Sequence, residues 1–420
     1  KLFWIWLSKT WFVNDAVSRN PFKSTVFVWS DIGSFRQPGN YNIKMVRHPD
    51  IVPKNAMLLM AYKPLRATHL SQWFDKQHGE LFLSGAHMAG TKNTWMVFHA
   101  QFLQVFHEYV ESSFFVGDDQ PLLQTTCMQQ QNLCQVVTPD MVEGQTWFGL
   151  PHALQNGLFK QRPVTIQLQT PCVNDDFTPV ANLSVWTLVT DGALYAKGAE
   201  KLGRSLQRHV TAPADFVIME LKTKPLPTQV WKKLHKIGWK RCIVNRIAPI
   251  DESNTLPRFR DQFTKLHAWG MTHYDTLLYL DSDTLVLKSI DKLLNTKLSN
   301  SKIGVARDFG AGKWRPTFNM GVFLIHPNQL EYRRLLRMQS LSQVEFNTAM
   351  SEQGFLNAVY KRQWHDIGFE HNANLAIYSQ AFKFWVEHES RIRIIHYTMQ
   401  KPWACSAVYA TPCSWWTRAL

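Results

Sequence analysis

Two acidic residues separated by one position carry the clearest chemistry in this sequence. Asp281 and Asp283 follow the apolar residues 277–280, and apolar residues resume at Leu285. A short apolar run bounded by polar residues predicts a strand buried on both faces, and ligands of open α/β sheets gather where such strands end. In extended chain, residues two apart point to the same side, so both carboxylates can share one cation. Hard oxygen ligands favour magnesium or manganese, which commonly keep substrate phosphates as ligands. A surface turn rich in aspartate is the structural alternative.

The composition limits the number of domains and the kinds of molecule that the protein can bind. The chain has 420 residues, 45% of them hydrophobic, which is enough for two or three domains. It has no apolar stretch of the length that a membrane span requires. The formal net charge of +14 favours anionic partners, and the sequence carries no nucleic-acid-binding signature. Because it begins at Lys1, we interpret it as the interior of a longer product, which could include an N-terminal membrane anchor.

The cysteines bear on the cellular compartment. Cys127 and Cys134, and likewise Cys405 and Cys413, are close enough in sequence to pair, as they would in an oxidising compartment. Six reduced thiols are an equally weighted alternative. The glycosylation sequon at Asn182 also favours the secretory pathway. We expect a Golgi lumen, with the cytoplasm as the alternative.

The chain divides into two α/β units. Residues 1–150 form the first, residues 151–183 an irregular connection, and residues 184–420 the second. In the first unit we expect a strand over 22–29, a second over 81–85 that leads into a polar segment, and a helix over 95–110. In the second, strands are predicted over 185–190, 215–220 and 242–244, and helices over 195–209, 231–237 and 258–274. Such alternation predicts a mostly parallel sheet with helices on both faces.

Six short motifs follow one another in the second unit. They are Thr187-Leu188 with Tyr195-Ala196-Lys197-Gly198-Ala199, Thr264-Lys265-Leu266-His267, Asp281-Ser282-Asp283-Thr284-Leu285-Val286-Leu287, Phe318-Asn319-Met320-Gly321-Val322-Phe323, Ser351-Glu352-Gln353-Gly354-Phe355-Leu356-Asn357, and His396-Tyr397 with Lys401-Pro402-Trp403. In this order they resemble the glycogenin-like glycosyltransferases of family 8 over about residues 184–403. The resemblance implies the nucleotide-sugar-binding fold called GT-A, with a Rossmann-like, mostly parallel central sheet.

The resemblance also implies roles for particular residues. The implied metal ligands are Asp281, Asp283 and His396, and the residues implied to bind a UDP-sugar are Leu188, Thr190, Tyr195, Lys265, Ser282 and Lys401. Asn319, Glu352 and Gln353 would face the donor sugar and form the catalytic group. The sequence departs from the family pattern in four places. Glu352 replaces an aspartate and Met320 replaces a small residue, the stretch between Thr190 and Tyr195 is one residue longer, and the segment between His396 and Lys401 is short and lacks the family's glycine.

The implied chemistry is transfer of a sugar with retention of anomeric configuration. A divalent ion and Lys401 would neutralise the charge that grows on the departing diphosphate. Glu352 or Gln353 would act near the anomeric carbon, either as nucleophile or as stabiliser. The structural alternatives are a core histidine for His396, a surface lysine with a buried stem for Lys265, and helix capping for Glu352 and Gln353.

The first unit resembles the HtrL/YibB group of presumed sugar-processing proteins. The residues that carry this resemblance are Asn20-Pro21-Phe22, Val28-Trp29-Ser30-Asp31-Ile32-Gly33 and the glycine-containing segment 84–91. It is also similar to the back half of a GT-A domain. On that interpretation Asp31 stands where a metal motif would be, and Asp118-Asp119-Gln120 matches the acid-Gln motif. A complete metal triplet is missing, so we expect no catalysis here.

The sequence therefore predicts a metal-dependent, retaining glycosyltransferase that takes a UDP-sugar and modifies a glycan or glycoprotein. The first alternative is a glycan-binding or scaffolding protein that keeps the fold without turnover. The second is a nucleotidyltransferase or a sugar-nucleotide hydrolase. The sequence does not identify the donor sugar or the acceptor.

Overall fold

The structure is a computed structural model in which the chain forms two compact units, residues 1–169 and 170–420. It describes residues 2–31, 46–63, 81–111, 114–129, 132–142, 147, 149–158, 163–165, 171–174, 176–190, 192–298, 302–340, 344–361 and 363–419. Among these residues no helix has the length and apolar character needed to cross a membrane. The unit boundary falls within the connection predicted for 151–183, but the first part of that segment forms structure in the first unit.

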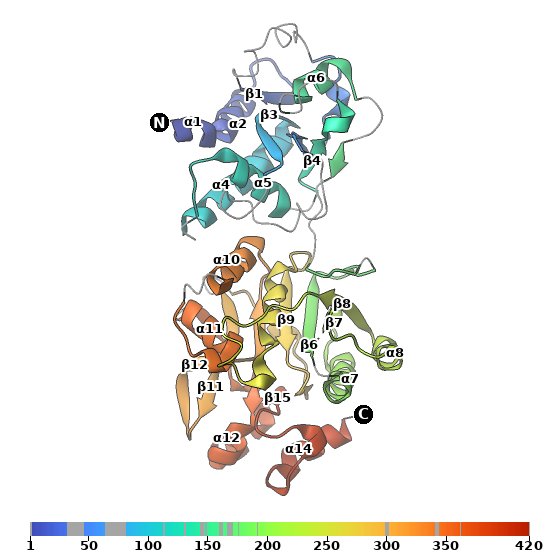
Figure 1. The fold of residues 1–420 in the computed structure, drawn as a ribbon, viewed down its shortest axis with the longest axis vertical. Helices are drawn as coiled ribbons and strands as arrows, with labels where there is room; N and C mark the ends of the chain where they lie inside the picture. Colours follow the sequence, from blue (N-terminus) through green and yellow to red (C-terminus); the bar gives the residue numbers. More distant parts are fainter. Residues whose placement is uncertain are drawn as a thin grey trace. The chain divides into compact units, whose positions relative to one another are not determined.

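The first unit is built on a five-stranded sheet of order β1-β3-β2-β4-β5 (Figure 1). Its strands are β1 (Val26–Ser30), β2 (Met57–Ala61), β3 (Leu83–Thr91), β4 (Cys134–Val137) and β5 (Val164–Thr165). Its helices are α1 (Leu2–Leu7), α2 (Lys9–Arg19), α4 (Lys92–Glu111), α5 (Asp119–Gln129) and α6 (Gly149–Asn156), with 3-10 turns at Pro49–Ile51 and Pro139–Met141. β2 and β4 run parallel, and the other pairs are antiparallel.

Two expectations for this unit need correction. The second strand does not give way to a polar loop after Gly85, because β3 continues to Thr91 and pairs with both β1 and β2. The connection predicted from residue 151 onward instead contains most of α6 and all of β5. The predicted helix over 95–110 is confirmed as α4.

The second unit contains a seven-stranded sheet of order β13-β11-β12-β9-β6-β7-β8, in which β12 alone runs against its neighbours. Its strands are β6 (Leu183–Val189), β7 (Ala214–Leu221), β8 (Trp239–Val244), β9 (Thr276–Leu280), β11 (Ile303–Gly310), β12 (Lys313–Ile325) and β13 (Trp364–Asp366). A small sheet joins β10 (Thr284–Val286), β15 (Ile394–His396) and β14 (Ala373–Asn374). The mostly parallel α/β architecture predicted from the sequence is confirmed.

Helices cover both faces of the large sheet. One face carries α10 (Gln329–Ser340) and α11 (Ser351–Val359), and the other carries α7 (Gly192–His209), α8 (Thr228–Lys236) and α9 (Asp291–Leu294). The helices α12 (Leu375–Gln380), α13 (Phe382–His388) and α14 (Ala410–Arg418) pack with the small sheet. Short 3-10 helices lie at Pro257–Phe259 (η6), Gln262–Gly270 (η7), Thr348–Met350, Phe369–His371, Glu389–Arg391, Pro402–Ala404 and Ala407–Tyr409.

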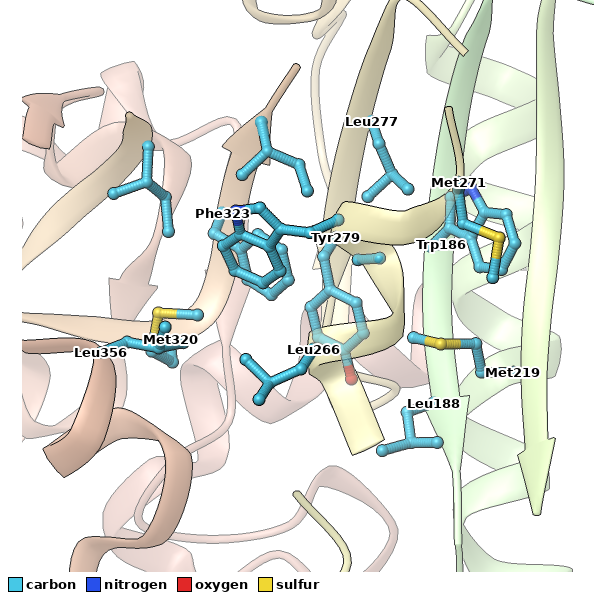
Figure 2. Packing of buried hydrophobic residues seen from close by; sticks show 14 of the residues in the cluster. Trp186, Leu188, Met219, Leu266, Met271, Leu277, Tyr279, Met320, Phe323 and Leu356 are labelled. Carbon is cyan, nitrogen blue, oxygen red and sulfur yellow. The ribbon is translucent and has the colours of Figure 1, made fainter. Parts of the chain in front are cut away.

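Alternation of side chains along the central strands explains why both faces are apolar. On β9, Leu277 and Tyr279 enter one core, whereas Leu278 and Leu280 enter the core on the opposite face. Figure 2 shows the first of these cores, where the ring of Tyr279 stacks on Phe323 with centroids 4.7 Å apart. The sheet is therefore held rigidly where β9 ends, which is the position of the acidic motif.

The helix predicted over 258–274 is wrong. That segment forms the two 3-10 helices η6 and η7, followed by a turn. Every residue from Phe263 to Gly270 is buried, so the segment has no exposed face over this length. Lys265 is therefore enclosed together with its apolar neighbours.

All six cysteines are paired in the structure. Cys127–Cys134 and Cys405–Cys413 are the pairs that the sequence indicated. Cys172–Cys242 was not predicted, because 70 positions separate its members. This third bond attaches the segment before β6 to the edge strand β8.

Candidate active site

The turn that carries Asp281 and Asp283 is fixed by its own strands. The backbone N–H of Asp281 donates to the carbonyl of Gly321 at 2.7 Å, and the Asp281 carbonyl accepts from Thr284 Oγ1 at 2.7 Å. The Tyr279 hydroxyl donates to Asp281 Oδ1 at 3.0 Å. Both carboxylates therefore stand at the carboxyl end of β9 in a set geometry.

His396 reaches this turn because β15 pairs with β10. Thr284 lies opposite His396 in that pairing, and the N–H of Tyr397 donates to the carbonyl of Asp283 at 3.0 Å. Nε2 of His396 lies 3.5 Å from Asp283 Oδ1 and 3.8 Å from Asp281 Oδ2. Residues more than a hundred positions apart thus meet at one point.

These three side chains form a donor set for a divalent cation. Each offers a ligand atom, and the three atoms lie within 4.8 Å of one another. Nδ1 of His396 lies 3.0 Å from Oδ1 of Asn372, so Nδ1 carries the proton and Nε2 presents its lone pair to the carboxylates. Two carboxylates and a neutral imidazole suit manganese or magnesium.

Gly321 on β12 makes room for the histidine. A Cβ atom added at this position would lie 2.0 Å from Cε1 of His396, so any larger residue would displace the imidazole. Since Gly321 also accepts the hydrogen bond from Asp281, the same residue positions two of the three ligands.

Lys265 is buried against two carboxylates. Its Nζ lies 2.9 Å from Asp281 Oδ1 and 3.0 Å from Glu352 Oε1, and it donates to the carbonyl of Met320 at 3.3 Å. The side chain is 2% exposed, which excludes the surface-lysine alternative. Burial alone would lower the pKa of Lys265, but Asp281 and Glu352 raise it well above the ordinary value. This lysine is a fixed charge that orients both acids.

Lys401 is the more accessible of the two lysines that contact the acidic motif. It forms an ion pair with Asp283, and its Nζ lies over the ring of Tyr195, 5.9 Å from the centroid. Burial alone would raise the pKa of Asp283, but the Lys401 ammonium group holds it well below the usual range. Asp283 is therefore ionised and able to bind a cation at neutral pH.

Asn319, Glu352 and Gln353 come together at the start of α11 and the middle of β12. Gln353 Oε1 accepts from the N–H of Met320 at 3.1 Å, and Asn319 Oδ1 accepts from the N–H of Gly321 at 2.9 Å. Asn372 also donates to Asn319 Oδ1, at 3.0 Å. Because its oxygen is occupied, the amide nitrogen of Gln353 is the group that can donate to a ligand, whereas the amide of Asn319 also bonds Asp308.

All twelve residues singled out in the sequence line one cavity of about 310 Å³ in the second unit. Its other lining residues include Arg258, Phe259, Gln262, Asp308, Met350, Asn374 and Thr398. Sequence reasoning did not identify these, nor Asn372, which holds the histidine. Asp308 lies within β11, after Arg307, so the strand-end pattern that marks Asp281 does not mark it. Asn372 belongs to no recognisable spacing.

Comparison with known proteins places this geometry in a family. Residues 193–407 match the model of glycosyl transferase family 8, and residues 4–152 match a family described as a bacterial protein of unknown function (HtrL_YibB). Both resemblances identified from the sequence are therefore confirmed.

Individual relatives cover the second unit. Rabbit (Oryctolagus cuniculus) glycogenin-1 is 32% identical over 232 residues, which is 52% of this chain and 64% of that protein. Human glycogenin-2 is 31% identical over 231 residues, 52% of this chain and 42% of that protein. The chain thus spans about two fifths to just under two thirds of these relatives.

Among solved structures, the apo form of the glycosyltransferase GlyE of Streptococcus pneumoniae TIGR4 matches with 21% identity and a TM-score of 0.42, over 57% of this chain and 60% of that one. The family model covers half of the sequence and contains the whole Asp-Asp-His cluster. The chain belongs to glycosyltransferase family 8, and its second unit has the GT-A fold.

Proposed function

We propose that the second unit is a retaining, metal-dependent glycosyltransferase that moves a sugar from a UDP-sugar to a glycan or glycoprotein acceptor. The observation that carries the proposal is the convergence of Asp281, Asp283, His396 and Lys401 in a cavity that Asn319 and Gln353 also line. The first group of residues suits a diphosphate, and the second suits a ring with several hydroxyl groups.

For a bound diphosphate, the protein supplies fixed positive charge. A divalent cation held by Asp281, Asp283 and His396 would neutralise the charge that grows on the departing diphosphate. Once a cation binds the carboxylates, the ammonium group of Lys401 would shift from Asp283 towards the phosphate oxygens. Tyr195, beneath Lys401, limits where its ammonium group can move.

Among the residues proposed to contact the sugar, Gln353 offers a donor. The amide nitrogen of Gln353 would donate to a hydroxyl or to the ring oxygen, because its oxygen is bonded to β12. Asn319 is held between Asn372 and Asp308. Glu352 is neutralised by buried Lys265, so we assign it a positioning role and place Gln353 nearer the anomeric carbon. The leaving phosphate would then accept the proton of the acceptor.

A screen of UDP release with manganese and a panel of UDP-sugars, with and without glycan acceptors, tests the proposal. The expected result is release that needs one donor, an acceptor and the metal. Equal release without an acceptor would mark a hydrolase, and no release with any pair would favour a scaffold. An Asp281→Ala variant run in parallel controls for contaminating activity.

We further propose that the protein works in an oxidising compartment, the Golgi lumen being the example we favour. Three disulfides that use every cysteine support this location. Alkylation of the native protein followed by mass spectrometry should find all six cysteines protected. Six alkylated thiols in freshly isolated protein would favour the cytoplasm.

A further inference from the structure

The first unit repeats the strand arrangement around the active site of the second. In the second unit, β9 pairs with β12 so that Tyr279 lies opposite Phe323 and Leu280 opposite Val322. In the first, β1 pairs with β3 so that Trp29 lies opposite Met88 and Ser30 opposite His87. Asp31 directly follows β1, and its N–H donates to a carbonyl of β3 at 2.8 Å. Asp281 directly follows β9, and its N–H donates to a carbonyl of β12 at 2.7 Å.

A β-bulge recurs at the same place in both units. The pairing of β2 with β3 shifts between Leu59 and Met60, and that of β11 with β12 shifts between Val305 and Ala306. In the first unit, Leu59 lies opposite Met88 of β3, which pairs with Trp29 on its other side. In the second unit, Val305 lies opposite Phe323 of β12, which pairs with Tyr279 on its other side. Such bulges redirect side chains beside functional sites, so the shared position indicates a shared site architecture.

The buried lysine and its two acids are repeated as well. Lys9 Nζ lies 3.0 Å from Asp31 Oδ2 and 2.8 Å from Asp119 Oδ2, and donates to the carbonyl of Gly85 at 2.8 Å. These contacts correspond to those of Lys265 with Asp281, Glu352 and the carbonyl of Met320. Trp29 Nε1 donates to Asp31 Oδ1 at 2.8 Å, as the Tyr279 hydroxyl does to Asp281.

The amide side chains on α5 match those on α11. Gln120 follows Asp119 as Gln353 follows Glu352, and its Nε2 donates to the carbonyl of Leu83 at 2.7 Å. Four residues further on, Gln124 Oε1 accepts from the N–H of Phe82 at 3.0 Å. Asn357 makes the same kind of bond to Phe318 in the second unit. The positions of both amides are thus repeated, but Gln120 bonds β3 through its nitrogen and Gln353 bonds β12 through its oxygen, so Gln120 would offer a sugar an acceptor where Gln353 offers a donor.

These groups line a cavity of about 240 Å³ in the first unit. Besides Lys9, Asp31, Asp119 and Gln120, its walls include the indole side chains of Trp6 and Trp147. A Cβ atom at Gly85 would lie 2.4 Å from Asp119 Oδ2, so the acid fits only because that residue is glycine. Lys9 and Asp119 are 4% and 5% exposed, which makes this a built polar site and not a surface cluster.

The features that would serve a diphosphate are not repeated. Position 33, two after Asp31, is a glycine in the sequence and lies outside the described residues, as does Ile32. The described part of the first unit contains no cluster of metal ligands like that at Asp281. Of the charged residues that line the cavity, three are acids and one is Lys9, which disfavours an anionic ligand.

We propose that this cavity is a binding site for a neutral sugar ring, such as the end residue of a glycan, and that it requires neither a nucleotide nor a metal. Carboxylate and amide groups would bond the hydroxyls, and the indole rings would cover an apolar face of the ring. The inference goes beyond the proposed transferase activity. It rests on that proposal only for the assignment of the residues that face the sugar in the cavity of the second unit.

Saturation-transfer NMR on the full chain in EDTA tests the inference, with methyl glycosides of glucose, galactose, mannose, xylose and N-acetylglucosamine as probes. We expect at least one glycoside to receive saturation, and Gln120→Ala to weaken its affinity about tenfold. Gln353→Ala, the matching change in the second unit, should leave that affinity unchanged. Thermal unfolding by circular dichroism establishes that each variant is folded.

Three results would overturn the inference. They are no saturation of any probe, equal affinity in Gln120→Ala and wild type, and loss of the signal when UDP and diamagnetic magnesium, added in excess over the EDTA, fill the second cavity. Asp119→Asn is a second variant, which keeps the size of the side chain and should also weaken binding. Because UDP release is not measured here, failure of this proposal is distinct from failure of the proposed transferase.

Discussion

Nδ1 of His396 lies 3.0 Å from Oδ1 of Asn372, a hydrogen bond that turns Nε2 towards Asp281 and Asp283. Partners of this kind fix the tautomer and the ring orientation of a metal-binding histidine. The site therefore depends on a residue that contacts the histidine and belongs to none of the motifs found in the sequence.

Replacing Asn372 should weaken metal binding without removing a ligand. For Asn372→Ala we expect manganese affinity in the presence of UDP to fall roughly 10- to 100-fold, because the imidazole loses its orienting partner. Titration followed by electron paramagnetic resonance of free manganese measures this. Asn328→Ala is the control, since Asn328 bonds the N–H of Glu331 at the start of α10. Wild-type affinity in Asn372→Ala would contradict the proposed tautomer.

Loss of the Lys265 charge should destabilise the second unit. Lys265→Met leaves the buried Glu352 carboxylate without a counter-charge and removes the partner of half-buried Asp281, and loss of one partner of a buried pair costs about 3–5 kcal/mol. Urea unfolding measures the loss, and Lys265→Met with Glu352→Gln should lose less than the single variant. An unfolding midpoint for Lys265→Met equal to that of wild type would show that the pair contributes nothing.

Acid should destabilise the second unit through His267. Burial lowers the pKa of His267 from 6.5 to about 4, and the neutral ring bonds Tyr332 and the carbonyl of Asn245. The unfolded chain takes up a proton below pH 6.5 while the folded one does not, so stability falls as the pH drops from 6.5 towards 4. The expected loss is roughly 3 kcal/mol. His267→Gln should flatten the profile measured by urea unfolding, and an unchanged slope would refute this assignment.

Removal of the Lys401 charge should separate diphosphate binding from nucleoside binding. Lys401→Ala is expected to weaken UDP about tenfold or more while uridine loses little, because the lysine would contact phosphate oxygens. Isothermal titration of both ligands in manganese measures the two affinities. Lys197→Ala is a control that removes a lysine from α7 and keeps the acidic motif intact. Equal losses for UDP and uridine would rule out a pyrophosphate contact.

Much of the fold was predictable because its signals are local. The apolar run before Asp281 and the alternating strands and helices from residue 184 onward gave the mostly parallel sheet. The segment 258–274 was misassigned because Phe259, Phe263 and Leu266 have the spacing of an α-helical face, whereas in the structure every residue from 263 to 270 is buried and no single face is distinguished. β2 was missed, although its residues 57–61 are all buried.

The site residues that belong to a sequence motif could be predicted, and those outside the motifs could not. Asn372 and Lys9 were out of reach, because their roles arise from pairing between distant elements. The motif of the first unit, Asp118-Asp119-Gln120, was visible, but its lysine was not. Which acid the lysine contacts is decided by tertiary packing, and one sequence holds no record of that.

The most direct test of the account is calorimetric titration of UDP with and without manganese, comparing wild type with Asp283→Ala. Asp275→Ala, which removes an exposed acid just before β9 begins, is the matched control. We predict that manganese strengthens UDP binding in wild type and in the control, and that this gain disappears in Asp283→Ala. The same gain in Asp283→Ala as in wild type would contradict a cation held between Asp281, Asp283 and His396.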